Sequence, residues 1–210
     1  MAMEKVKKND FIELEFIGKV KNGEVFDTNI SEEAKKIGLK IDDKPFILCI
    51  GQEMVIKGLD KSLNGKEIGK TSSVDLLPSE AFQERKSSLV RLIPLSVFTQ
   101  QKILPKQGMT LALDNMLVKI VSVSGGRVLV DFNNPLSGKI VSYEFTIKRK
   151  VDDINEKIQA ITDYFIRKDV KFDLKDTKIL LEIEEAFSPI IAILNNKFKP
   201  IINLEFELKK

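Results

Sequence analysis

The 210-residue chain contains no histidine, and its only cysteine is Cys49. Histidine is the commonest general base near neutral pH and the commonest zinc ligand in proteins. Its absence, together with the single thiol, argues against a zinc site and against a nucleophile activated by imidazole. We therefore expect chemistry that needs no imidazole proton shuttle, and neither a metal nor a cofactor.

Long apolar runs are also missing. No stretch approaches the roughly 18 apolar residues of a membrane span, and no apolar core follows the charges at the N-terminus. Cys49 lies in an apolar segment and has no second cysteine with which to pair. We expect it to be a buried packing residue, as is typical of a free thiol in the cytoplasm. The sequence thus predicts a soluble, cytoplasmic protein that is not exported.

A charge excess of one sign is lacking as well. The chain has 34 basic and 31 acidic residues, a net charge of +3, and the two signs alternate along it. This pattern favours a solvated surface with charges of both signs over a basic surface that binds the phosphates of a nucleic acid. We therefore expect no nucleic-acid partner. An RNA-binding edge in the C-terminal region is an alternative that salt-dependent retention would test; it would use Lys168, Lys171, Lys175 and Lys178.

The most informative stretch is residues 45–58. An apolar run from Pro45 to Ile50 indicates a buried strand, which Gly51 ends, and Val55 and Ile56 then lead into a short amphipathic helix. Two aliphatic side chains held at such a turn can form the floor of a shallow apolar pocket. Upstream, residues 10–20 and 24–28 read as two strands joined by the Asn22-Gly23 turn. Residues 71–77 read as a further strand.

Residues 86–136 form a block rich in strands. We expect strands at 89–93, 111–123 and 127–132, with a break at Asp114-Asn115 and a hairpin turn at Gly125-Gly126. One helical turn is expected at residues 94–98. Because an alternating strand resumes at residues 140–148, the block reads as an inserted domain.

The last 60 residues read as a small α+β module that follows a boundary near residues 150–153. Ile154, Ile158, Ile161 and Phe165 are spaced as one face of an amphipathic helix. Strands are expected at 170–174, 179–183 and 201–208, and a helix at 186–198 despite Pro189. The oligomeric state and the role of this module do not follow from the sequence.

In order along the chain, these segments resemble the FKBP (macrolide-binding) family of peptidyl-prolyl isomerases. The resemblance implies an α+β fold, an antiparallel half-barrel wrapped on a short helix. It also implies catalytic roles for Asp27 and Phe82. The substrate pocket would be lined by Phe16, Phe26, Phe46, Val55, Ile56, Leu59, Ala81 and Tyr143. Phe16 and Phe82 stand where many members have tyrosine, and Leu59 replaces a tryptophan, so we expect weaker binding of macrolide inhibitors.

The inserted block resembles the insert-in-flap domain of the SlyD-type branch, on residues 91–98 and 130–138. The C-terminal module resembles, more weakly, the extra domain of long archaeal members. The implied domains are an isomerase domain (1–85 with 137–150), an insert with chaperone activity (86–136) and a C-terminal α+β domain (151–210). A groove for client chains would be formed by Leu92, Ile93, Val97, Phe98, Leu111 and Met116. The alternative, that these side chains form the internal core of the insert, stays open.

Isomerisation fits a chain without histidine because no bond is made or cleaved. The twisted amide in the transition state is less polar than the planar one, so an apolar pocket favours it. We therefore expect a prolyl isomerase with chaperone activity that assists the folding of proline-containing unfolded or nascent polypeptides. The alternative is a non-catalytic chaperone with a degenerate isomerase pocket.

Overall fold

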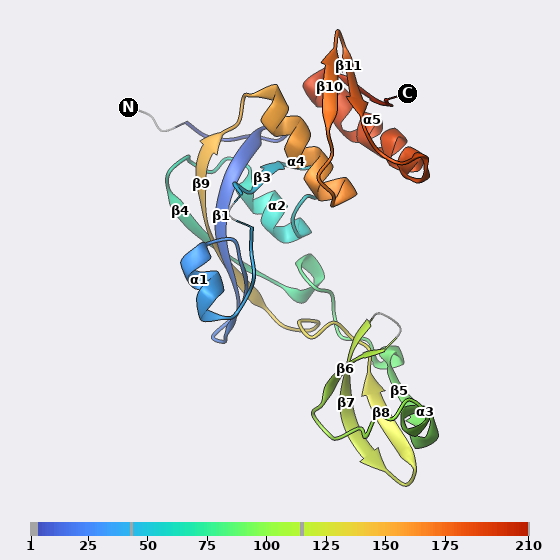
Figure 1. The fold of residues 1–210 in the computed structure, drawn as a ribbon. Coiled ribbons are helices and arrows are strands. Elements are labelled where there is room, and N and C mark those ends of the chain that lie inside the picture. Colours follow the sequence, from blue (N-terminus) through green and yellow to red (C-terminus); the bar gives the residue numbers. More distant parts are fainter. Residues whose placement is uncertain (1–3, 43, 114–115, 210) are drawn as a thin grey trace. The chain divides into compact units, whose positions relative to one another are not determined.

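The computed structural model describes residues 4–42, 44–113 and 116–209 (Figure 1). The chain divides into two compact units, Met1–Leu76 with Ser142–Lys210, and Leu77–Val141. Within the described residues, no helix is long and apolar enough to cross a membrane. The α+β fold class expected from the sequence is confirmed.

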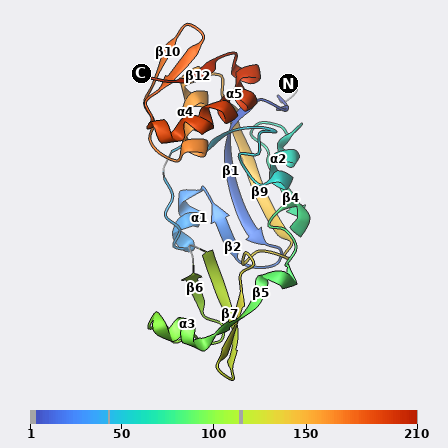
Figure 2. The same cartoon turned by 90° about the vertical axis from the view of Figure 1, so that its right-hand side faces the viewer.

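The first unit is built around the long strand β1 (Phe11–Val20). The other strands of its sheet are β2 (Val25–Thr28), β3 (Ile47–Cys49), β4 (Thr71–Leu76) and β9 (Val141–Lys150). The order is β2-β1-β9-β4 (Figure 2). Strand β3 pairs with β1 as well. Both β2 and β3 run antiparallel to β1, β2 beside its second half and β3 beside its start.

The first unit also contains two short helices, α1 (Ser31–Lys36) and α2 (Lys57–Leu63). Leu59 and Leu63 of α2 are almost wholly buried, because they lie on one face of the helix at a spacing of four residues. The strand, turn and helix expected over residues 45–63 are therefore confirmed. The hairpin between β1 and β2 turns at Asn22, which has a positive φ of 60°.

The second unit contains an antiparallel sheet in the order β5-β8-β7-β6. Its elements are η1 (Pro78–Glu80), η2 (Ser87–Leu89), β5 (Val90–Pro94), α3 (Leu95–Gln100), β6 (Thr110–Leu113), β7 (Met116–Ser124) and β8 (Arg127–Asp131). Gly125 and Gly126, both with positive φ, turn β7 into β8 as expected. The break expected at Asp114-Asn115 lies outside the described residues.

The C-terminal elements belong to the first unit. They are α4 (Ile154–Ile166), β10 (Phe172–Lys175), β11 (Lys178–Leu181), η3 (Glu185–Phe187), α5 (Ser188–Ile202) and β12 (Glu205–Leu208). The sheet order is β10-β11-β12, with β11 and β12 parallel. Pro189 lies in the first turn of α5, where its missing N–H leaves no helical bond unmade. The strand expected from residue 201 begins only at Glu205, because α5 continues through Ile202 and ends at Asn203 with φ 56°.

Helices α4 and α5 pack on the sheet of the first unit. The Val151 N–H donates to the Phe11 carbonyl over 2.8 Å. The ring centroids of Phe11 and Phe198 lie 6.3 Å apart, and those of Phe198 and Phe165 lie 5.6 Å apart. The C-terminal residues thus share a compact unit with the sheet, and their treatment as a separate third domain stays a prediction.

Candidate active site

Four aromatic side chains from four segments meet on one face of the first sheet. Tyr143 of β9 lies 5.9 Å from both Phe16 of β1 and Phe26 of β2, measured between ring centroids. Phe46, just before β3, meets Phe16 edge to face at 5.8 Å. Edge-to-face contacts at this separation are favourable because the positive ring edge meets the negative ring face. The structure therefore brings these four predicted site residues together.

The close approach of Tyr143 to β1 depends on Gly18. A Cβ atom on Gly18 would lie 2.9 Å from Cε1 of Tyr143 and 3.2 Å from Cζ of Phe26, so any side chain at this position would force the Tyr143 ring to shift. A glycine inside a strand signals close approach of another group. Sequence reasoning missed Gly18, although that signal was present.

Asp27 is paired with Gly18 across the β1–β2 hairpin and is therefore next to the aromatic cluster. Burial raises the pKa of the Asp27 carboxyl above its usual value, and a hydrogen bond from the backbone of Thr28 opposes that rise only in part. Burial, and after it the charge of Asp27, raise the pKa of Tyr143 well above its usual value. The cluster thus combines apolar ring surface, a protonated phenol and a poorly solvated carboxyl.

The edge of β1 between β2 and β3 is closed by two side chains that sequence reasoning also missed. The Asn29 amide accepts from the Phe16 N–H over 2.8 Å and donates to the Leu14 carbonyl over 2.6 Å. The Thr28 hydroxyl donates to the Phe16 carbonyl over 2.8 Å. These bonds take the place of a strand partner and fix the backbone that carries Phe16.

Val55 and Ile56, both half-buried, close the turn that leads into α2. The turn is shaped by Asp60, whose carboxylate accepts from the Gly51 N–H over 2.7 Å and from the Glu53 N–H over 3.0 Å. Gly51 and Glu53 have positive φ values of 84° and 59°. Asp60 is almost fully buried, and it therefore sets where Val55 and Ile56 lie.

The same turn is held from the other side by the C-terminal helices. The Tyr164 hydroxyl of α4 donates to the Glu53 carbonyl over 2.9 Å, and Nζ of Lys197 in α5 donates to the Gln52 carbonyl over 3.3 Å. Both contacts join residues more than 100 positions apart in the chain. No local sequence pattern indicates them.

Two predicted site residues, Ala81 and Phe82, belong to the second unit. They follow η1, both are half-buried, and the Phe82 carbonyl accepts from the Ser137 hydroxyl over 2.9 Å. Within the first unit, Leu59 lies beneath the turn and is 1% exposed. The roles expected for Ala81, Phe82 and Leu59 stay predictions.

The residues expected to form the client groove differ in how far their side chains are exposed to solvent. Leu92, Val97 and Met116 are 61%, 41% and 46% exposed, and Ile93 and Leu111 are half-buried. Phe98 is 1% exposed and packs in the insert core with Val118, Ile120, Val128 and Val130. Phe98 is therefore a core residue and does not belong to the groove. A small sheet has few side chains with which to form a core, so burying this large ring stabilises it. Leu104 and Leu117, which are 76% and 55% exposed, were not predicted.

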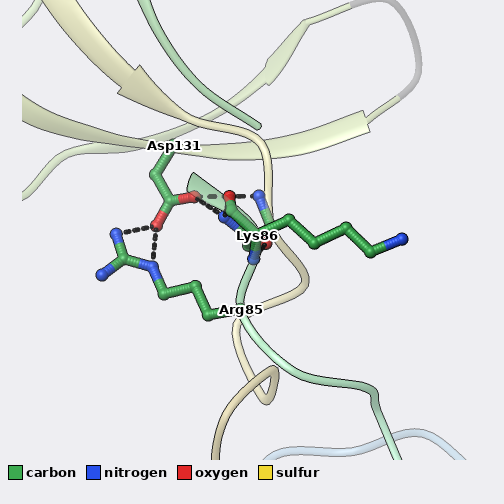
Figure 3. Close-up of polar contacts among 4 residues, drawn as sticks. Arg85, Lys86 and Asp131 are labelled. Carbon is green, nitrogen blue, oxygen red and sulfur yellow. Dashed lines mark hydrogen bonds and ion pairs between the residues drawn. The ribbon is translucent and has the colours of Figure 1, made fainter. Parts of the chain in front are cut away.

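The two ends of the insert are tied together by an ion pair. Nε and Nη2 of Arg85 donate to Oδ2 of Asp131, and the backbone N–H and side-chain amide of Asn133 donate to Oδ1 (Figure 3). The Asn133 amide also bonds the backbone of Lys86 in both directions. Burial would raise the pKa of Asp131, but the bonds from Asn133 and Arg85 outweigh it and lower that pKa. Arg85 and Asn133 were not predicted.

Comparison with known proteins shows the family. A profile described as FKBP-type peptidyl-prolyl cis-trans isomerase matches residues 2–96, and one described as FKBP26, IF domain, matches residues 91–136. The chain is 30% identical over 146 residues to the short-type peptidyl-prolyl cis-trans isomerase of Methanocaldococcus jannaschii, which covers 68% of this chain and 91% of the relative. The chain belongs to the FKBP-type peptidyl-prolyl cis-trans isomerases.

Other members of this FKBP-type family are similar over the same length. The SlyD isomerase of Helicobacter pylori is 28% identical over 150 residues, covering 69% of this chain and 74% of the relative. That of Aeromonas hydrophila is 26% identical over 148 residues, covering 69% of this chain and 64% of the relative. The resemblance seen in the sequence is thereby confirmed, and the isomerase interpretation is supported over the non-catalytic alternative.

Proposed function

We propose that the aromatic cluster and the Val55-Ile56 turn form a pocket in which the X-Pro bond of a polypeptide is rotated. The protein has the activity of its family, peptidyl-prolyl cis-trans isomerisation. The observation that supports this location is the meeting of Phe16, Phe26 and Tyr143 beside the poorly solvated Asp27. The proposal assigns the activity to these particular residues.

The reaction needs a pocket of this kind. Rotation about the peptide bond has a barrier of about 20 kcal/mol because amide resonance must be broken. The twisted amide has less charge separation than the planar one, so an apolar site from which water is excluded lowers the barrier. No proton has to be moved, in keeping with the absence of histidine.

Each residue then has a distinct role. Phe26, Phe46 and Tyr143 surround the proline ring with apolar surface. The Ile56 N–H, at the start of α2, has no acceptor within the helix and holds a substrate carbonyl. The Asp27 carboxylate faces the rotating carbonyl carbon, where poor solvation strengthens its field.

We further propose that the insert captures unfolded polypeptide before isomerisation. Leu92, Val97, Met116 and Leu117 give the insert exposed apolar side chains, as expected of a surface that binds apolar client segments. The clients are proline-containing unfolded or nascent chains. A cytoplasmic setting agrees with Cys49, a buried free thiol whose pKa is raised to about 12 by burial and then by the charges of Asp60 and Asp10.

The test is the refolding rate of a protein that is limited by proline isomerisation. We expect the unchanged chain to accelerate refolding at low molar ratio. Asp27→Ala and replacement of residues 86–136 by a short loop should each remove most of that acceleration. Suppression of aggregation at stoichiometric amounts alone, indifferent to Asp27→Ala, would instead establish a non-catalytic chaperone.

A further inference from the structure

A groove runs between helix α4 and the segment that leads into β3. Its volume is about 890 Å³, within the range of roughly 300–1,000 Å³ that is typical of ligand sites. One wall includes Ile41, Phe46 and Ile47, and the other includes Gln159, Ala160 and Tyr164 of α4. We call this feature the α4 groove.

The α4 wall of the groove is fixed in place. Helix α4 packs against β3 (Figure 1), and the Tyr164 hydroxyl is bonded to the Glu53 carbonyl over 2.9 Å. At the start of the helix, Glu156 accepts two hydrogen bonds of 2.9 Å from Arg149 on β9. Because both ends of α4 are held by the sheet or its loops, the groove is a built part of this unit.

The groove shares Phe46 with the proposed proline pocket. This residue lines the groove, and its ring also meets Phe16 edge to face at 5.8 Å. A polypeptide whose proline lies in the pocket therefore has a second surface beside it, along which the chain can continue.

The chemistry of the groove suits a polypeptide main chain. Beside its apolar side chains the groove is lined by the amides of Asn155 and Gln159, and an amide can both donate to and accept from a peptide group. Its charged side chains are of both signs and nearly balanced: the acidic ones are Asp42, Glu156, Asp163 and Asp169, and the basic ones are Lys44, Arg167 and Lys168. This mixture selects no net charge, so it fits an extended segment of ordinary composition better than a charged ligand.

We propose that the α4 groove binds the part of the substrate polypeptide that flanks the proline. This inference rests on the proposed function, and it assigns to the C-terminal module a share in substrate binding. Its consequence is a preference for long unfolded chains over short proline peptides. The preference belongs to the first unit and does not depend on the insert.

The test compares kcat/KM for two substrates, a short proline peptide and a long unstructured peptide with the same residues around the proline. Ala160→Trp fills the groove from α4. We expect it to lower kcat/KM for the long peptide by about tenfold, mainly through KM, and to leave the short peptide unchanged. Ile41→Trp, from the opposite wall, should do the same and covers the case in which Ala160→Trp does not fold.

The matched control is Ala186→Trp, at an exposed position of the same module outside the groove lining. It should leave both substrates unchanged. Since the insert is unaltered in every variant, any binding there cancels in the comparison. Equal losses on both peptides, or no loss on either, would overturn the proposal. If the unchanged protein turns over neither peptide, the proposed function itself fails and the groove proposal fails with it.

Discussion

Gly18 is the residue that lets Tyr143 lie against β1. Gly18→Ala places a Cβ atom 2.9 Å from Cε1 of the Tyr143 ring, and the ring must move. We expect a loss of about 1–3 kcal/mol in the free energy of unfolding, as for other overpacked sites, and a marked fall in isomerase activity. Denaturant unfolding and a peptide isomerisation assay measure the two effects.

Gly38→Ala is the control for Gly18→Ala. Gly38 has a positive φ of 69° but nothing within 4 Å of an added Cβ. Its replacement should cost roughly 1 kcal/mol through the left-handed backbone alone and leave the activity intact. Equal activity in the two variants would contradict the role given to Gly18.

Asp27 is expected to reduce stability while it serves the reaction. Its pKa is raised above the ordinary 3.8, chiefly by burial, so folding penalises the ionised form. The penalty is fully present at neutral pH, begins to fall as the pH drops through the folded-state pKa, and is gone only below the unfolded-state value of 3.8. Asp27→Asn should therefore unfold at the same or a higher denaturant concentration at pH 7, yet lose activity.

The unchanged protein should lose activity in acid as Asp27 becomes protonated, over a pH range centred above 3.8 because the pKa is raised. The pH profile of kcat/KM measures this loss. A destabilised Asp27→Asn variant that keeps full activity would show instead that Asp27 is a structural residue.

At the scale of elements, the turn over residues 51–54 is held by α2, α4 and α5 together. Lys197→Met removes the bond from α5 to the Gln52 carbonyl. A hydrogen bond contributes about 1 kcal/mol, and the same free energy lost from the transition state would lower kcat/KM about fivefold, which is the largest fall that we expect for a short proline peptide. Tyr164→Phe should act in the same direction through the Glu53 carbonyl.

Lys199→Met supplies the matched control in the same helix, because Nζ of Lys199 bonds the exposed Glu205 and does not contact the turn. Its kcat/KM should equal that of the unchanged protein. Similar effects from Lys197→Met and Lys199→Met would mean that the module stabilises the fold without positioning the turn.

At the scale of the whole molecule, the elements that could be predicted from the sequence are those marked by local patterns. The β1–β2 and β7–β8 hairpins follow from alternation and from Asn-Gly and Gly-Gly turns, and α4 follows from its apolar spacing. Asn29, Asp60 and Tyr164 escaped prediction because their partners lie in other segments. Phe98 was assigned to the client groove because an apolar residue in a small domain can be interpreted equally well as a core residue or as a surface residue.

The position of the insert within the chain has a consequence for biosynthesis. The second unit, residues 77–141, contains the insert and precedes most of β9, which carries Tyr143. Domains form as their residues leave the ribosome, N-terminal parts first. The insert, a continuous stretch, is complete while the aromatic cluster still lacks its central ring. The surface proposed to capture unfolded chains is thus made before the pocket proposed to act on them.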